Sequence, residues 1–165
     1  MIWAAVGILA FVTLQRLMEL WIAGSNTRRL LAEGAREHAK GHYPLIVAIH
    51  AGWLAALWWW APGRSISIPL LLVFVLLQLG RFWIIRSLGE RWTTRIIVKP
   101  GAPLVRRGPY RHVDHPNYLV VAGEIAVLPL VFGLWQAAVV FTLLNAAVLT
   151  LRIRAENDAL RSLRG

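Results

Sequence analysis

The chain has 165 residues, a length typical of one domain, and 58% of its residues are hydrophobic while only 16% are charged. Its mean hydropathy of +0.56 is above the range of ordinary soluble domains. The formal net charge is +10, but no nucleic-acid-binding motif accompanies the charge, so we expect no nucleic-acid partner. There is no cysteine, which excludes disulfides, thiolate metal sites and cysteine nucleophiles. We therefore expect an integral membrane protein.

Three apolar runs in the first half have about the length that a helix needs to cross a bilayer, and they cover residues 2–23, 44–60 and 66–85. The last run, 118–151, is 34 residues long. As one helix it would measure about 51 Å, against a hydrocarbon core of about 30 Å. It must therefore turn back, and Pro129 to Gly133 carry the turn signal. The pattern predicts an all-α membrane fold with five transmembrane helices, of which the last two form a hairpin.

Basic residues gather between these runs, with four in 24–43, eight in 81–117 and four from residue 152 onward, whereas the other side holds only Arg64. Positive charge marks the cytoplasmic side, so this pattern predicts an outside N-terminus and a cytoplasmic C-terminus, and we expect a bacterial inner membrane. The basic side would contact anionic membrane lipids. We expect one domain, 1–165, in which 1–86 holds three spans and 87–165 holds a loop, the hairpin and a tail.

The most polar stretch is GPYRHVDHPNY, residues 108–118, directly before the last apolar run. Pro116 suits the first turn of a helix, so His115 would lie near the N-cap, where free N–H groups favour anions. The Gly108-Pro109 turn would bring Tyr110 to the same place. The stretch therefore predicts a small anion-tolerant site, and a helix cap with interfacial aromatic residues explains the spacing equally well.

A second polar group follows the hairpin in LRIRAENDAL, 151–160, where Arg152 and Glu156 are four residues apart and share a helix face. The hairpin would return both to Tyr110, His115 and Tyr118. On its own, the spacing is also typical of an ion pair on a solvated tail.

Other ionisable residues lie inside the predicted spans, where charges usually pair or serve a function. Arg16 and Glu19 are three residues apart, which favours a self-contained pair. Glu124 would lie below the polar stretch, where it could contact a ligand. His50 could face a substrate tunnel, or it could be a hydrogen-bonded core histidine.

Taken together, these motifs resemble the isoprenylcysteine carboxyl methyltransferase and phospholipid methyltransferase superfamily. Its pattern is a G-x-Y turn, R-H-P-x-Y, a helical hairpin and R-x-x-x-E-E. Here the corresponding segments are Gly108-Pro109-Tyr110, Asp114 to Tyr118, and Arg152 to Asn157. The stretches 14–21, 41–50 and 92–110 also look like the short bacterial branch of that family, so the resemblance covers most of the chain.

The resemblance implies an enzyme, a methyltransferase with a cytoplasmic pocket for S-adenosylmethionine and no metal. It implies that Arg152 lies beside the methyl acceptor. Two positions depart from the family pattern: Asp114 replaces a basic residue, and Asn157 replaces the second Glu. The implied cofactor residues are Arg95, Ala102, Pro103, Leu104, Val105, Tyr110, His115, Pro116, Asn117, Tyr118 and Glu156.

Methyl transfer needs alignment more than it needs bases, but a phenol, with a pKa near 10, needs deprotonation or a nearby cation. Arg152 could supply the cation, and His115 is a candidate base. The resemblance favours a lipophilic acceptor of the alkylresorcinol or alkylpyrone kind. A prenylcysteine carboxylate is second and a phospholipid amine third. Two alternatives of other classes are an NADPH-dependent reductase of related fold and a non-catalytic membrane scaffold or transporter.

Overall fold

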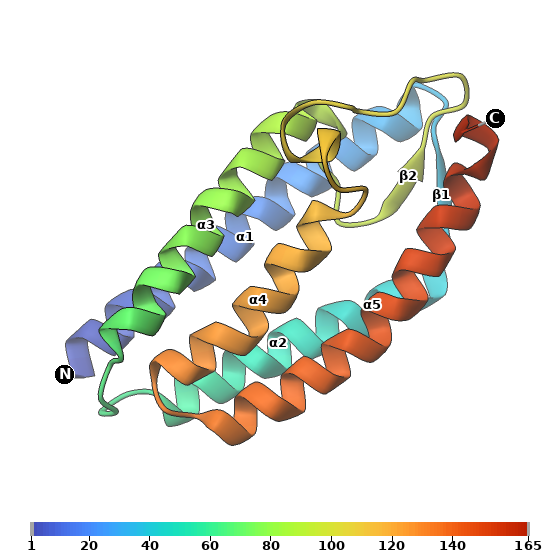
Figure 1. Ribbon diagram of the computed structural model, residues 1–165. Helices are drawn as coiled ribbons and strands as arrows, with labels where there is room; N and C mark the ends of the chain where they lie inside the picture. The colour runs from blue at the N-terminus through green and yellow to red at the C-terminus, as the bar shows by residue number, and fades with distance from the viewer. Residues whose placement is uncertain (1, 165) are drawn as a thin grey trace.

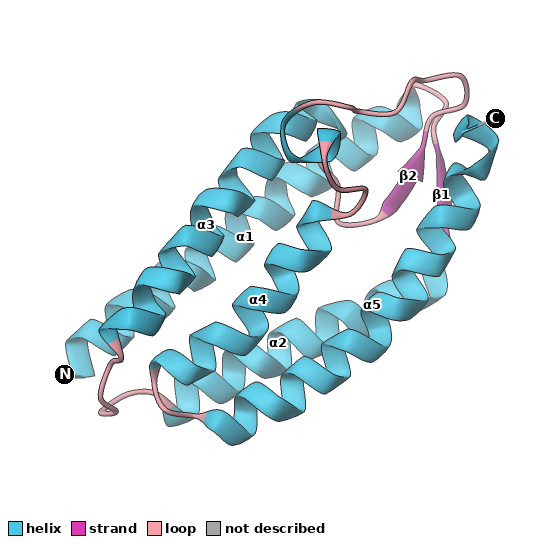
Figure 2. Ribbon diagram, viewed as in Figure 1, coloured by secondary structure: helices cyan, strands magenta, loops and turns pink. Residues whose placement is uncertain are grey.

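The computed structural model describes the backbone of residues 2–164 and the side chains of residues 2–160. Long helices dominate this part of the chain and lie side by side in an elongated bundle (Figures 1 and 2). The helices are α1 (Ile2–Ala32), α2 (Tyr43–Trp60), α3 (Ile68–Leu88), α4 (Pro116–Val131) and α5 (Trp135–Arg164). The strands are β1 (Arg36–His38) and β2 (Ile96–Val98), and single turns of 3₁₀-helix cover Lys40–His42, Gly89–Arg91 and Gly108–Arg111.

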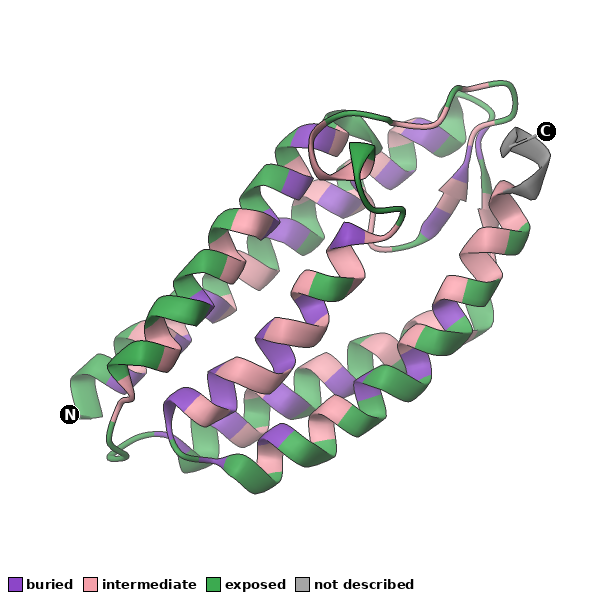
Figure 3. Cartoon of the chain, in the orientation of Figure 1, coloured by how far each residue is buried: buried purple, intermediate pink, exposed green. Residues whose placement is uncertain are grey.

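Several of these helices are long and apolar enough to cross a membrane. Within the described residues four segments meet this condition: Ile2–Ala32, Lys40–Trp60, Ile68–Arg91 and Trp135–Leu160. Large apolar side chains cover their outer faces, with Trp3 84% and Trp59 82% exposed, while the inner faces are buried (Figure 3). Such outward apolar surface requires lipid around it, so the chain is an integral membrane protein.

The predicted hairpin is confirmed, because α4 and α5 are antiparallel neighbours joined by three residues (Figure 1). The turn is a Schellman motif, in which Leu134 N–H donates to the Pro129 carbonyl and Gly133 N–H to the Leu130 carbonyl, both at 3.0 Å. Gly133 has φ 69°, a left-handed conformation that glycine adopts without strain. With 16 residues α4 measures about 24 Å, so a full fifth crossing stays a prediction.

Prolines set where three of the helices begin. Pro44, Pro69 and Pro116 each lie in the first turn of α2, α3 or α4, where the missing N–H costs no helical hydrogen bond. Pro116 thereby fixes where α4 begins, at the end of this helix that lies away from the α4–α5 turn.

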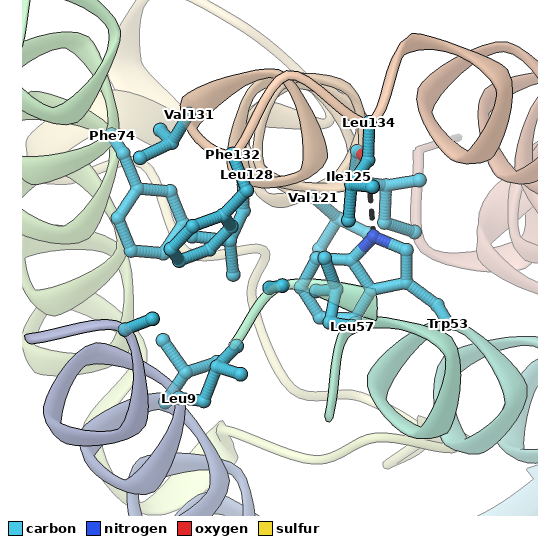
Figure 4. Close-up of a cluster of buried hydrophobic side chains, with 13 residues drawn as sticks. Leu9, Trp53, Leu57, Phe74, Val121, Ile125, Leu128, Val131, Phe132 and Leu134 are labelled. Carbon is cyan, nitrogen blue, oxygen red and sulfur yellow. Dashed lines mark hydrogen bonds between the residues drawn. The ribbon is translucent and has the colours of Figure 1, made fainter. Parts of the chain in front are cut away.

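The main core lies at the hairpin end of the bundle, between α4 and the helices around it (Figure 4). Trp53 of α2 donates its indole N–H to the carbonyl of Ile125 in α4, at 3.2 Å. The same core contains Leu9 of α1, Phe74 of α3 and Leu128 of α4. The hairpin end is thus tightly packed, and the polar residues lie toward the opposite end.

The prediction of an all-helical fold missed one small sheet. Strand β1 pairs antiparallel with β2, with Glu37 opposite Ile97. Strands of three residues are too short to show a two-residue period in the sequence. The helices continue beyond the predicted spans: α1 runs past residue 23 to Ala32, and α3 runs past residue 85 to Leu88. The sheet joins the loops that follow α1 and α3 at one end of the bundle.

Candidate functional site

Two cavities share a wall at the sheet end of the bundle. The first, of about 770 Å³, lies between β2, the 99–115 loop, the start of α4 and the end of α5. The second, of about 280 Å³, lies between α1, α2 and α4 and has mostly apolar walls. The residues that line both are Trp92, Thr93, Asn117, Tyr118 and Arg152. A ligand in either cavity would therefore contact these side chains.

The shared wall contains a chain of hydrogen bonds that starts at Glu156. The Tyr118 hydroxyl donates to the Glu156 carboxylate and accepts from Arg152 Nε at 2.9 Å. Arg152 Nη2 donates to the Thr94 carbonyl at 2.7 Å. Tyr118 stands in the first turn of α4, and the other two side chains lie one turn apart on α5. The hairpin thus brings together three of the residues singled out in the sequence.

His115 completes this end of α4. Its ring stacks on the Tyr118 ring, with centroids 5.3 Å apart. Its Nε2 is 3.1 Å from Asn157 Oδ1, and its Nδ1 is 3.7 Å from a Glu156 carboxylate oxygen. Asn157, one of the two departures from the family pattern, therefore orients His115. The other, Asp114, lines the first cavity.

Residues from 95 to 110, which cover β2 and much of the loop after it, form another wall of the first cavity. Arg95 lines it while pairing with Glu37 of β1 at 3.0 Å and lying over the Tyr43 ring. Tyr110 also lines it, and burial, with the charge of Glu156, raises the pKa of its phenol, which stays neutral. The same wall includes Ala102, Pro103, Leu104 and Val105. Pro116, at the start of α4, is buried and is absent from both linings.

Two polar atoms of the shared wall are buried and lack a hydrogen-bond partner among the described residues. They are the donor Trp92 Nε1 and the acceptor Asn117 Oδ1. An unpartnered buried polar group costs about 1–3 kcal/mol, so these atoms favour a ligand that supplies both an acceptor and a donor. The sequence marked Asn117 through its motif, but it assigned no site role to Trp92.

Glu124 lies in neither cavity wall. Its carboxylate is fully buried and accepts hydrogen bonds from Arg16 at 2.6 Å and Arg81 at 3.1 Å. The predicted Arg16–Glu19 pair exists, at 3.1 Å, but it is not self-contained, because Arg81 also binds Glu19. Arg81 was counted with the basic loop in the sequence, whereas the structure buries it inside α3.

His50 of α2 lines the second cavity. Its Nδ1 is 2.9 Å from the Ile46 carbonyl, one helical turn earlier. Both alternatives left open by the sequence therefore apply, because this histidine lines a cavity and is also hydrogen-bonded. Among the side chains that the structure describes, no three His, Asp or Glu gather where they could hold a metal ion.

Comparison with known proteins adds a family and two relatives. The model of the isoprenylcysteine carboxyl methyltransferase (ICMT) family matches residues 70–162, which include α3, the loop, the hairpin and the shared wall. The uncharacterized protein YpbQ of Bacillus subtilis is 34% identical, over 93% of this chain and 95% of its own. An uncharacterized protein of Haemophilus influenzae is 26% identical, over 90% of each chain. No solved structure matches significantly.

Proposed function

Because the chain belongs to the isoprenylcysteine carboxyl methyltransferase family, we propose that it transfers a methyl group from S-adenosylmethionine to a lipophilic acceptor within the membrane. The observation that carries this proposal is the wall shared by a polar and an apolar cavity. Such a wall allows a water-soluble donor and a lipid to meet although they arrive from different phases.

The first cavity suits the cofactor in size and chemistry. Ligand sites commonly measure about 300–1,000 Å³, and this one has about 770 Å³. Trp92 Nε1 and Asn117 Oδ1 offer a free donor and a free acceptor, as an adenosyl or amino acid group requires. Glu156 would attract the cationic part, and Arg95 and Lys99 the carboxylate. When bound, S-adenosylmethionine supplies an electrophilic methyl group on a sulfonium.

The second cavity suits an apolar acceptor. Leu17, Leu20 and Val47 line it and are also exposed on the outside of α1 and α2, so the cavity reaches the lipid between these helices. A lipid could enter sideways from the bilayer. Arg152 lies at the inner end, where its guanidinium would stabilise negative charge on an acceptor oxygen.

Charge favours an oxygen acceptor over an amine. Arg16, Arg81 and Arg152 all line the second cavity, and Glu19 is the acidic residue among its lining side chains. Arg16 and Arg81 are paired with Glu19 and Glu124, so Arg152 is the cation that would attract a phenolate, enolate or carboxylate in preference to a cationic phospholipid headgroup. We therefore favour O-methylation of a phenolic or pyrone lipid, with a prenylcysteine carboxylate second and a phospholipid amine third.

The basic loops support a proposed orientation of the chain in the membrane. The sheet brings the loops after α1 and α3 together, and the end of α5 lies beside them, while the N-terminus lies at the other end (Figure 1). We place the basic end, with the first cavity, in the cytoplasm of a bacterial cell and the N-terminus outside the inner membrane. All of residues 1–165 then form one membrane methyltransferase domain.

Calorimetry of the purified protein in detergent tests the proposal. Wild type should bind S-adenosylmethionine, Glu156→Ala should bind it at least tenfold more weakly, and the exposed Glu90→Ala should match wild type. Absence of binding by wild type would refute the proposal. Stabilisation by NADPH instead would favour a reductase, and full methyl transfer by His115→Ala would remove His115 from the catalytic residues.

A further inference from the structure

The hydrogen bond of His50 determines which ring nitrogen carries the proton. The Ile46 carbonyl can only accept, so His50 Nδ1 donates to it across 2.9 Å. In the neutral ring the other nitrogen, Nε2, then has a free lone pair. The ring is half-buried and lines the second cavity, so Nε2 is the atom that it can present to an acceptor molecule there.

The other titratable side chains around the second cavity are already engaged. Both carboxylate oxygens of Glu19 accept from arginine, and the Tyr118 hydroxyl bridges Glu156 and Arg152. The Tyr43 hydroxyl pairs with Thr94 Oγ1 at 3.1 Å. Among the described residues that line this cavity, His50 is thus the titratable group with an uncommitted proton-accepting atom.

His115, the base predicted from the sequence, is poorly placed for this task. Both of its ring nitrogens face oxygen atoms of α5, one from Asn157 and one from Glu156. It also lines the first cavity and not the second. A general base has to reach the acceptor that it deprotonates. The position of His115 in the first cavity therefore argues against His115 as this base.

The charges around His50 are balanced. Arg16 and Arg81 are paired with Glu19 and Glu124, and Arg152 shares the Tyr118 hydroxyl with Glu156. All three arginines near the second cavity are thus engaged with acidic partners, directly or, for Arg152, through the Tyr118 hydroxyl.

We propose that His50 Nε2 is the general base that deprotonates the hydroxyl of the acceptor. This inference rests on the proposed methyltransferase function. A carboxylate is already ionised at neutral pH and needs no base, whereas a phenol, with a pKa near 10, does. An acceptor cavity that contains an available base therefore suits a hydroxyl.

Proton transfer from the acceptor precedes or accompanies methyl transfer. The acceptor O–H bond breaks and its proton moves to His50 Nε2, which becomes part of an imidazolium. The oxygen lone pair forms the new bond to the methyl carbon as the carbon–sulfur bond breaks, and that electron pair stays on sulfur. Arg152 stabilises the negative charge on the oxygen before transfer. Nε2 returns its proton to solvent when the product leaves.

A chromophoric ligand tests the base without any methyl donor. The probe is a nitrophenol with an alkyl tail, added to detergent-solubilised protein at a pH below its own solution pKa. Wild type should bind it as the coloured phenolate, because Nε2 takes the proton. His50→Asn keeps an amide N–H for the Ile46 carbonyl but has no basic nitrogen, so it should bind the probe as the colourless phenol.

Rates supply the second readout. His50→Asn should methylate a hydroxyl lipid about 10²-fold or more slowly, as for loss of a general base, and a fatty carboxylate at nearly the wild-type rate. Added imidazole should restore part of the hydroxyl activity in His50→Ala. The exposed His112→Asn, whose side chain lines neither cavity, should match wild type in all assays.

Three outcomes would overturn the inference: phenolate bound equally by His50→Asn, an unchanged hydroxyl rate, or equal losses with both acceptors, which indicate a structural role. His50→Gln replaces the Asn variant if the latter does not fold. Failure of wild type to bind S-adenosylmethionine would refute the proposed function itself. Normal cofactor binding with a fully active His50→Asn would refute only the role of the base.

Discussion

Arg81 of α3 binds Glu19 of α1 with two hydrogen bonds of 2.6 Å, one to each carboxylate oxygen. The same guanidinium donates to Glu124 of α4 at 3.1 Å, and Arg16 bonds to both acids. Two arginines and two glutamates thus form a neutral cluster that joins three helices, and none of their side chains is more than 15% exposed. Within apolar surroundings such charges persist only when paired.

Arg81→Leu should lower the free energy of unfolding by about 3–5 kcal/mol, because it leaves two buried carboxylates with Arg16 as their shared cation. Equilibrium unfolding in mixed detergent micelles would measure this loss. Arg86→Leu is the matched control, since Arg86 lies on the same helix but is exposed. The double variant Arg81→Leu/Glu19→Leu keeps the neutral Arg16–Glu124 pair and should be more stable than Arg81→Leu alone. Equal stability of Arg81→Leu and Arg86→Leu would contradict the cluster's role.

This cluster also shows where sequence reasoning ends. The three-residue spacing of Arg16 and Glu19 predicted a local pair, whereas Arg81 and Glu19 are 62 positions apart and meet only through packing. The α4–α5 hairpin could be predicted because the length of one continuous segment is sufficient evidence: an apolar run that is longer than the bilayer is thick must turn back. The free polar atoms of Trp92 and Asn117 could not, because being without a partner depends on every neighbour in space.

Gly108→Ala should disrupt the loop over the first cavity. Gly108 has φ 57°, and a Cβ there would collide with Ser87 Oγ and lie 3.2 Å from Trp83 Nε1. The left-handed backbone costs about 1–2 kcal/mol for alanine, and the collision adds about 1–3 kcal/mol. Thermal unfolding and calorimetry with S-adenosylmethionine would measure the losses in stability and affinity.

Gly101→Ala is the control for this substitution, because Gly101 has φ 73° but no atom within 4 Å of a Cβ. It should show only the cost of the backbone conformation. Adding Ser87→Ala to Gly108→Ala removes the closest atom and should restore part of the stability. If the Gly108→Ala and Gly101→Ala variants had the same melting temperature, the collision with Ser87 would not destabilise the protein.

Tyr118→Phe should weaken the shared wall. The hydroxyl is the atom through which Arg152 Nε and Glu156 are joined, and Arg152 is buried. Leaving its Nε without a partner costs about 1–3 kcal/mol, which corresponds to a loss of roughly 5-fold to 150-fold in kcat/KM or cofactor affinity. Initial rates and calorimetry would measure it. Tyr43→Phe, which loses one hydrogen bond to Thr94, should have a smaller effect, and the reverse order would argue against the Tyr118 bridge.

The Glu33–Lys99 contact should make stability depend on acidity. Lys99 Nζ donates to Glu33 at 2.6 Å, and this hydrogen bond lowers the pKa of Glu33 below its ordinary 4.5. A carboxyl group whose pKa is lower in the folded than in the unfolded protein stabilises the fold at pH values above its unfolded-state pKa. This stabilisation is lost as the pH falls through its folded-state pKa. The difference in melting temperature between wild type and Glu33→Gln should therefore be small but positive near pH 6 and should shrink as the pH falls below the ordinary pKa of 4.5. A difference that does not change with pH would mean that the ion pair contributes nothing.

Ala51→Trp should separate acceptor binding from cofactor binding. Ala51 lines the second cavity, and an indole at this position would occupy part of the cavity's volume of about 280 Å³. The first cavity does not include this position, so the affinity for S-adenosylmethionine should stay at the wild-type value while KM for the lipid rises about tenfold or more. Ala55→Trp is the matched control, because Ala55 lies one turn further along α2, is exposed, and lines neither cavity. If both variants keep the wild-type KM, the lipid does not use the second cavity. If Ala51→Trp weakens both ligands equally, the two cavities are not independent binding sites, and the meeting of donor and acceptor at Tyr118 and Arg152 has to be abandoned.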